Sequence, residues 1–340
     1  MTMEDTARAG DLVPPPEPPP TSRVRRRGLP DVVGRFALAG VAVGIFVLFT
    51  ILLPDTYATK PNILSMLSSQ SIPLLLTLAV LLPLRTGDFD LSVAANMVFC
   101  SALLGIMVRH GAVPLPLAIL LTLLVGVAIG LINGVLIVLV GVNAFIVTLG
   151  AMTVLGGLAF GITGGAVIVN LPTSLLQMGR SHLLGLPLAV WYGWAIAGIL
   201  WYVFELTPLG RYLLFVGGNA EAAELAGVPV RASRMTAFAG SAFLSAVAGV
   251  ILAAKFGSVD PTIAGSLLLP PYAAAFLGTT VIQLGRFNVL GSIVGSYLLT
   301  IGITGLLLSG ADPWVSDVFN GGALMAAVTF ARLVSRKKVR

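Results

Sequence analysis

Long apolar stretches separated by short polar breaks make up most of this chain. A helix needs about 20 apolar residues to cross a bilayer. The candidate spans are residues 36–53, 63–84, 91–108, 115–140, 144–162, 188–206, 235–256, 271–282, 289–308 and 315–331. This pattern predicts an all-α membrane protein with about ten transmembrane helices, some of them short or broken, gathered in one domain at residues 35–332.

Three parts of the chain depart from a straight span. Residues 271–282 are too short for a full crossing, so we expect a half-helix or re-entrant segment whose neighbour completes the traverse. The first apolar stretch begins too far from Met1 for a cleaved signal peptide, and its length predicts an uncleaved anchor. Residues 1–34 are rich in proline and arginine, which predicts a disordered cytoplasmic tail, and residues 333–340 form a basic cytoplasmic tail.

The basic residues predict the orientation, because short cytoplasmic loops carry the excess of Lys and Arg. With the N-terminus inside, sixteen of the 20 basic residues lie on the inner side and four on the outer side. The four outer residues are Lys60, Arg109, Arg180 and Lys255. We therefore expect a multi-pass protein of the bacterial inner membrane, in contact with lipid, with both termini in the cytoplasm.

The composition and the missing motifs exclude several function classes. Only 10% of the residues are charged, against about 25% in soluble domains. There is no GxxxxGK[ST] loop, no HExxH, no GxSxG and no Cys/His cluster. His110 and His182 fall in expected external loops, and Cys100 lies in an apolar stretch where packing explains it. The basic residues are scattered rather than gathered on one face, so we expect no nucleic-acid partner. Because the motifs above are missing, we expect no catalytic residue, no metal and no cofactor on this chain.

A glycine stripe marks the span 115–140. Gly126, Gly130 and Gly134 repeat at four-residue spacing, which leaves one smooth helix face for close packing. A glycine track along a pore is the alternative. The spacing recurs at Gly40 with Gly44 and at Gly291 with Gly295.

Two carboxylates, Asp88 and Asp90, lie in the break TGDFDL at or near membrane depth, where a charge is costly. Gly87 lets the chain turn, and Asp90 or Ser92 can cap the following helix. Three interpretations remain open: a structural cap, the lining of a solute path, and an ion-coupling site. The candidates for a path are Asp88, Asp90, Ser92, Asn96, Asn133 and Thr148, and Asn133 can instead form a hydrogen bond between helices.

A second break, LGRFNV at residues 284–289, resembles TGDFDL at residues 86–91. Each stands between an apolar stretch and the next span. The likeness hints at an internal repeat, although glycine is common in any membrane break.

The largest internal hydrophilic segment covers residues 207–234 and predicts a short cytoplasmic helix. Asn219 can act as its N-cap, Glu221 falls in the positive first turn, and Gly227 followed by Pro229 ends it. A solvent-exposed surface helix and a docking element for a partner both fit this pattern.

Several stretches resemble the ribose-type permease subunits of bacterial ABC importers. GGNAEAAELAGVPV is similar to the coupling-loop signature of that family, and TGDFDLSV, GLINGVLI and TPLGRY match in the expected order. The resemblance covers about residues 62–332. Asp88, Ala94 and Ala95 stand where the family usually has Gly, Gly and Ser, which puts the solute in doubt more than the fold.

The resemblance implies a type II importer permease fold and a transport role. Two permease chains, identical or related, would form the path for a sugar-like solute. ATP and Mg would bind a separate ATPase, and an external solute-binding protein would deliver the ligand. The residues that the resemblance assigns to ATPase coupling are Gly217, Gly218, Asn219, Glu221, Ala222, Ala223, Glu224 and Gly227.

Two other functions stay open. An ion-coupled secondary transporter would use Asp88 and Asp90. A permease of the same type could carry an amino acid or a nucleoside.

Overall fold

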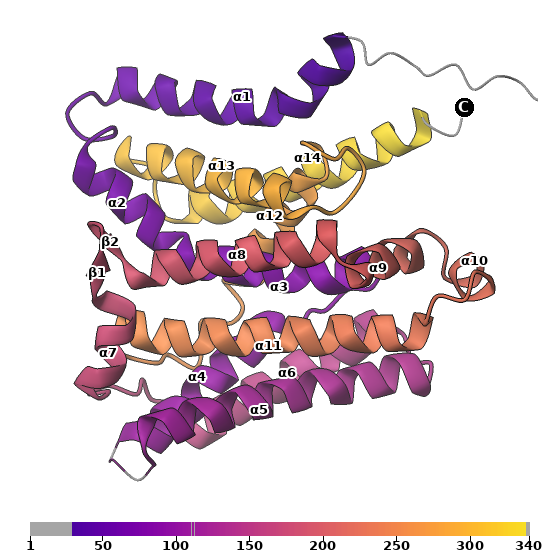
Figure 1. Ribbon diagram of the computed structural model, residues 1–340. Coiled ribbons are helices and arrows are strands. Elements are labelled where there is room, and N and C mark those ends of the chain that lie inside the picture. Colours follow the sequence, from indigo (N-terminus) through magenta and orange to yellow (C-terminus); the bar gives the residue numbers. More distant parts are fainter. Residues whose placement is uncertain (1–28, 110, 112, 338–340) are drawn as a thin grey trace, which may run out of the picture.

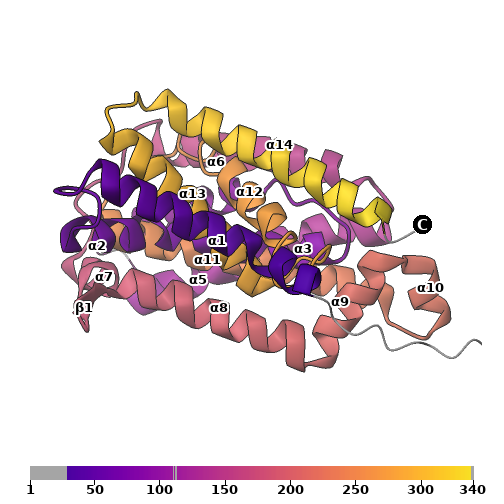
Figure 2. The same ribbon diagram turned by 90° about the horizontal axis from the view of Figure 1, so that it is seen from above.

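The computed structural model describes residues 29–109, 111 and 113–337. These residues form a bundle of helices (Figures 1 and 2). Of the expected N-terminal tail, only residues 29–34 fall within the described ranges, and they form the start of the first helix rather than a coil. His110 and residues 338–340 lie outside the described residues.

Long helices supply the body of the bundle. They are α1 (Leu29–Leu52), α4 (Val93–Arg109), α5 (Leu115–Gly134), α6 (Ala144–Thr163), α8 (Leu188–Leu206), α11 (Val230–Phe256), α13 (Val289–Leu308) and α14 (Trp314–Lys337). The shorter helices are α2 (Lys60–Ser69), α3 (Ser71–Arg85), α7 (Thr173–Arg180), α9 (Pro208–Gly218), α10 (Ala220–Leu225) and α12 (Leu269–Gly278). A π-helix, Val135–Leu139, continues α5, and β1 (His182–Leu183) pairs antiparallel with β2 (Leu186–Pro187).

Within the described residues, six helical segments are long and apolar enough to cross a membrane. They include α2 and α3 taken together as Lys60–Arg85. Two shorter apolar helices, Phe36–Leu52 and Val93–Arg109, add to them. The chain is therefore a multi-pass helical membrane protein, while the number of about ten crossings stays a prediction.

The two ends of the bundle differ in what they carry (Figure 1). At one end, here called the α10 end, lie α9 and α10 together with the start of α1 and the end of α14. At the opposite end, the hairpin end, lie α7 and the β1–β2 hairpin. There Arg180 of α7 donates a hydrogen bond to the carbonyl oxygen of Lys255, at 2.8 Å, near the end of α11. The start of α1 and the end of α14 thus lie at the same end of the bundle as α10.

Helices α3 and α11 form the centre of the bundle. Nearly every side chain of α3 is buried, and α11 packs against α3, α4 and α5. In contrast, α5 and α6 expose many large apolar side chains, such as Leu124 and Ile146. An apolar surface of this kind suits contact with lipid.

The glycine stripe on α5 is a close helix contact, as the spacing predicted. A Cβ atom at Gly130 would clash with the Cβ of Ala242 and lie 2.6 Å from the carbonyl oxygen of Phe238, both on α11. Gly126 and Gly134 also face α11. Gly291 and Gly295 face α12 in the same way, whereas Gly40 and Gly44 have no atom of this chain within 4 Å of such a Cβ, among the described residues. Packing within the chain therefore does not explain the α1 pair.

Two predicted spans have a different form in the structure. The stretch 63–84 is two helices, because Pro73 has no amide hydrogen to donate to the carbonyl oxygen of Ser69, and the helix breaks at Gln70. The stretch 115–140 ends in the π-helix. The half-helix α12, expected from the length of the short stretch 271–282, begins two residues before that stretch and ends within it, at Gly278.

We predict that Gly130→Leu prevents normal packing of α5 on α11. Forcing a side chain into this contact should lower the stability of the fold by about 3 kcal/mol. Thermal unfolding of the purified chain measures the effect. Gly44→Leu is the matched control, because nothing in the described chain faces Gly44, and an equal loss in both variants would contradict the packing role.

Candidate functional site

The break between α3 and α4, residues 86–92, turns at Gly87, whose φ is +86°. Asp88 follows and forms a two-pronged ion pair with Arg234 in the first turns of α11. Arg234 donates from Nε to Oδ2 at 2.8 Å and from Nη2 to Oδ1 at 2.7 Å. The geometry is the strong, planar arrangement that guanidinium and carboxylate groups favour. Both residues line a cavity of about 440 Å³ at this place.

Asp90 lies deeper and is 1% exposed. Its Oδ1 accepts hydrogen bonds from the amide and the hydroxyl of Ser92, at 3.1 and 2.5 Å, and its Oδ2 accepts one from Ser241 of α11 at 3.0 Å. The Tyr272 hydroxyl of α12 donates to the Asp90 carbonyl oxygen at 2.8 Å. The predicted cap is therefore present, directly before α4, and it also joins α4 to α11 and α12.

The other path candidates are buried as well. Asn133 of α5 donates to the Ser92 hydroxyl at 3.1 Å, so it forms a hydrogen bond within the chain, to the first break rather than to a residue inside another helix. Asn96 of α4 donates to the Ala242 carbonyl at 3.0 Å and to the Ser245 hydroxyl at 2.7 Å. The Thr148 hydroxyl donates to the Ala144 carbonyl within α6 at 2.8 Å.

These side chains hold the interior of one chain together. Of the six candidates, Asp88 lines a described cavity, while the other five are at most 3% exposed. Their role in a solute path stays a prediction.

The second break, between α12 and α13, repeats the geometry of the first. Gly285 turns with φ +77°, and Asn288 caps α13 by accepting from the Gly291 amide at 2.7 Å. The Asn288 amide group also donates to the carbonyl oxygens of Gly278, Val281 and Arg286. Each break thus places a positive-φ glycine three residues before a buried capping side chain. The sequence likeness of the two breaks therefore has a counterpart in structure.

One aromatic ring joins the two breaks. Phe276 of α12 stacks on Phe89 with ring centres 6.3 Å apart and meets Phe287 edge-on at 5.2 Å. Phe89 also stacks on Tyr272 at 6.0 Å. These four residues, called here the aromatic cluster, connect residues 86–92 with residues 279–288.

The segment 207–234 contains more helix than predicted. Helix α9 precedes the expected short helix, so Gly217 and Gly218 end α9 rather than forming a free turn. Asn219 caps α10 as expected, its Oδ1 accepting from the Ala222 amide at 2.9 Å. Gly227, with φ +78°, then ends the helix, and the Val228 amide donates to the Ala223 carbonyl oxygen.

Helices α9 and α10 pack against the rest of the chain through small residues. A Cβ atom at Gly217 would clash with the carbonyl oxygen of Arg85, so only glycine lets α9 approach the end of α3 this closely. Ala223, which the resemblance assigns to ATPase coupling, is 5% exposed and faces this chain, so its side chain is not open to a partner. Glu221 and Glu224 are exposed, and Leu225 is 92% exposed. The outward face of α10 therefore carries two glutamates and one exposed leucine.

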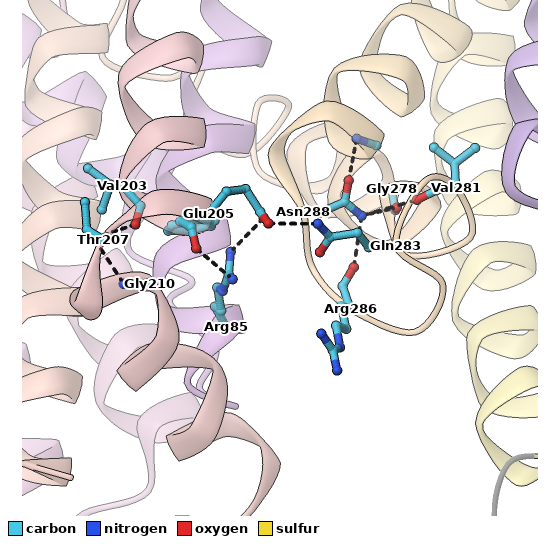
Figure 3. A network of polar contacts seen from close by, with 12 residues as sticks. Arg85, Val203, Glu205, Thr207, Gly210, Gly278, Val281, Gln283, Arg286 and Asn288 are labelled. Atoms are coloured by element: carbon cyan, nitrogen blue, oxygen red, sulfur yellow. Dashed lines mark hydrogen bonds and ion pairs between the residues drawn. The ribbon is translucent and has the colours of Figure 1, made fainter. Parts of the chain in front are cut away.

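A cavity of about 870 Å³ lies between α10 and the two breaks. Its walls include Arg85, Gly217, Ala222, Ala223 and Arg286. Figure 3 shows the polar network beside it, in which Gln283 donates to Glu205 at 3.0 Å and a Glu205 oxygen lies 3.9 Å from Arg85 Nη1. Among the described residues, no group of three His, Cys, Asp or Glu side chains is placed to hold a metal ion.

Comparison with known proteins assigns this architecture. The family model described as branched-chain amino acid transport system / permease component matches residues 62–328. The chain belongs to this permease family. The resemblance seen in the sequence is thereby confirmed, and the protein is a membrane-spanning permease subunit.

Individual relatives agree with the family match. Ribose import permease protein RbsC of Haemophilus influenzae is 28% identical over 314 residues, covering 90% of this permease and 97% of the relative. Autoinducer 2 import system permease protein LsrD of Salmonella paratyphi B is 32% identical over 256 residues, covering 74% and 76%. Its counterpart LsrC is 29% identical over 296 residues, covering 87% and 85%. No solved structure matches the permease.

The sequence did not reveal several partners in this site. Arg234 lies 146 positions along the chain from Asp88, which it binds. The partners of Asp90, Ser241 and Tyr272, lie 151 and 182 positions from it. No local pattern marks them. A bare carboxylate in an apolar region does signal that some partner exists, because an unpaired charge there is costly.

We predict that Asp88 and Arg234 act as a coupled pair. Asp88→Asn and Arg234→Gln should each lower the stability by about 1–3 kcal/mol, because the first leaves the half-buried Arg234 and the second the buried Asp88 without its partner. The double variant should lose less than the sum of the two. Thermal unfolding in detergent measures this, with the exposed Arg231→Gln as control. Strictly additive losses would refute the coupling.

Proposed function

We propose that this permease is one half of the membrane path of an ATP-driven importer for a sugar-like solute. The single observation that carries the proposal is α10, a capped helix that projects from the bundle end of a chain in this permease family. A second permease chain, identical or related, would complete the path. An external solute-binding protein would deliver the solute at the hairpin end.

A separate ATPase chain would supply the energy, with ATP and Mg bound there. The sequence has no phosphate-binding loop of its own. The exposed Glu221, Glu224 and Leu225 on α10 form an acidic face with one apolar side chain. Such a face suits a cleft with basic rims and an apolar floor, because complementary charge guides docking and the buried apolar group supplies the affinity.

Movement of α10 has a short physical route to the membrane interior. Gly217 packs closely against the Arg85 carbonyl group at the end of α3. Beyond α10, Arg234 in the first turns of α11 holds Asp88 in the first break. The aromatic cluster then joins the first break to the second. A displacement of the loop 207–234 would therefore shift both breaks together.

The solute class follows from the relatives. One is a ribose import permease and others are autoinducer 2 import permeases. The amino acid named in the family description is the alternative substrate class.

Ion coupling receives less support from the site. Asp88 is neutralised by Arg234, and Asp90 is satisfied by hydroxyl and amide donors. A coupling carboxylate must be free to take up an ion in one state. Uptake driven by an ion gradient, with no ATPase present, would nevertheless establish that mechanism in place of this proposal.

For the topology we propose ten crossings, with the α10 end in the cytoplasm and an even number of traverses between the termini. The helical segments fit this number when α2 with α3, and α12 with its flanking loops, each count as one traverse.

We predict opposite labelling of cysteines placed at the two ends. In a Cys100→Ala background, Ser181→Cys and Asp312→Cys should react with an impermeant thiol reagent in cells whose outer membrane is permeable to it. Val142→Cys and Ala220→Cys should react only after the inner membrane is opened. All four positions are exposed. Labelling of Val142→Cys or Ala220→Cys from outside would overturn the orientation.

We predict that Leu225→Asp releases the ATPase while leaving the permease folded. Loss of the exposed apolar anchor should weaken ATPase binding by about tenfold or more. Co-purification of the ATPase from the native host, and solute-stimulated ATP hydrolysis in liposomes, report the loss. Glu221→Lys should act in the same direction.

The matched control is Leu184→Asp, because Leu184 is 84% exposed and lies at the hairpin end. It should retain the ATPase fully. If Leu225→Asp and Glu221→Lys also retain wild-type binding and stimulation, α10 is not the docking element.

A further inference from the structure

The cavity beneath α10 contains a buried cation whose hydrogen-bonding capacity is not used up. Arg85 is 6% exposed and ends α3 at the cavity wall. Its Nη2 donates to the Phe204 carbonyl oxygen at 3.2 Å, and its guanidinium carbon lies 4.2 Å above the Phe204 ring. Its Nε and Nη1 have no hydrogen-bond partner among the described residues. Buried donors of this kind normally have a partner.

The charges around the cavity do not cancel. Glu205 is the carboxylate beside Arg85, but its nearest oxygen is 3.9 Å away, beyond hydrogen-bond distance, and its other oxygen is taken by Gln283. Arg286 also lines the cavity, is exposed, and forms no ion pair within the described part of the chain. In Figure 3 it points away from Glu205. Two arginines therefore line the cavity, and Glu205, the carboxylate beside it, is partly engaged elsewhere.

We propose that this cavity binds a phosphate-bearing anion between Arg85 and Arg286. Guanidinium groups form strong paired hydrogen bonds with phosphate oxygens. A volume of about 870 Å³ has room for a phosphate with an organic substituent. The apolar walls, such as Leu84, Phe215 and Phe287, suit that substituent. The phosphate comes from a small cytoplasmic ester or from the headgroup of an anionic lipid.

Such an anion would connect three parts of the fold that meet at the cavity. Arg85 belongs to α3, Arg286 to the second break, and Ala222 and Ala223 to α10 itself. A bound phosphate would hold α3 and the second break together beneath α10. Its effect on ATP hydrolysis rests on the proposed function. The binding itself depends only on residues of this chain.

Binding is tested on the purified full-length permease in nanodiscs of phosphatidylcholine. Inorganic phosphate and glucose 6-phosphate, titrated at constant ionic strength, should raise the unfolding temperature in a saturable way. Replacing part of the lipid with phosphatidylglycerol tests the headgroup source. Arg286→Gln should weaken binding about tenfold, because it removes one charge-assisted contact. Arg286 is exposed, so this variant should fold normally.

Arg211→Gln is the control, because Arg211 is exposed on α9 and does not line the cavity. Stabilisation by phosphate or its ester that Arg286→Gln weakens and Arg211→Gln keeps supports a soluble ligand. The same pattern with phosphatidylglycerol alone supports a lipid headgroup. No stabilisation by any of the three probes, or equal weakening in both variants, overturns the proposal. Loss of ATPase docking does not enter this readout, so the two proposals fail separately.

Discussion

The structure depends on one constraint: a helix that stops inside an apolar bundle leaves amide and carbonyl groups that no water can satisfy. At the two breaks, residues 86–92 and 284–289, this permease supplies partners for such groups from its own side chains. Asp90, in the turn before α4, and Asn288, directly before α13, are the central ones. Their burial is the cost of placing irregular backbone inside the fold, and their hydrogen bonds make those breaks rigid and defined.

The same constraint explains why the polar residues of the interior are connected rather than scattered. The Ser92 hydroxyl accepts one hydrogen bond from Asn133 and donates one to Asp90, and Ser241 donates to the other oxygen of the Asp90 carboxylate. These contacts bring α4, α5 and α11 to one point. Toward the α10 end, Asp88 and Arg234 form an ion pair beside a cavity. Asp90 lies deeper, and its carboxylate is stabilised by hydroxyl and amide donors in place of a cation.

Features with a local cause could be predicted from the sequence. The half-helix α12 follows from the length of its apolar stretch, the cap at Asn219 from a residue type before an alanine-rich run, and the α5 contact from glycine spacing. Features set by distant neighbours could not. Gly40 and Gly44 have the same spacing as Gly126 and Gly130 yet face open space in the described chain. No sequence pattern around Arg234 indicates that it binds Asp88, and no pattern around Ala223 indicates that its side chain faces inward.

Phe276 has a consequence for how the permease could work as part of a pair. The Phe276 ring contacts the phenylalanine of each break, so either loop would lose this contact if it moved away from α12. We therefore expect the two breaks to move together with α12 as one unit. In an assembly of two such chains, each subunit would open as a whole, and a half-open subunit would be disfavoured by the packing of one side chain.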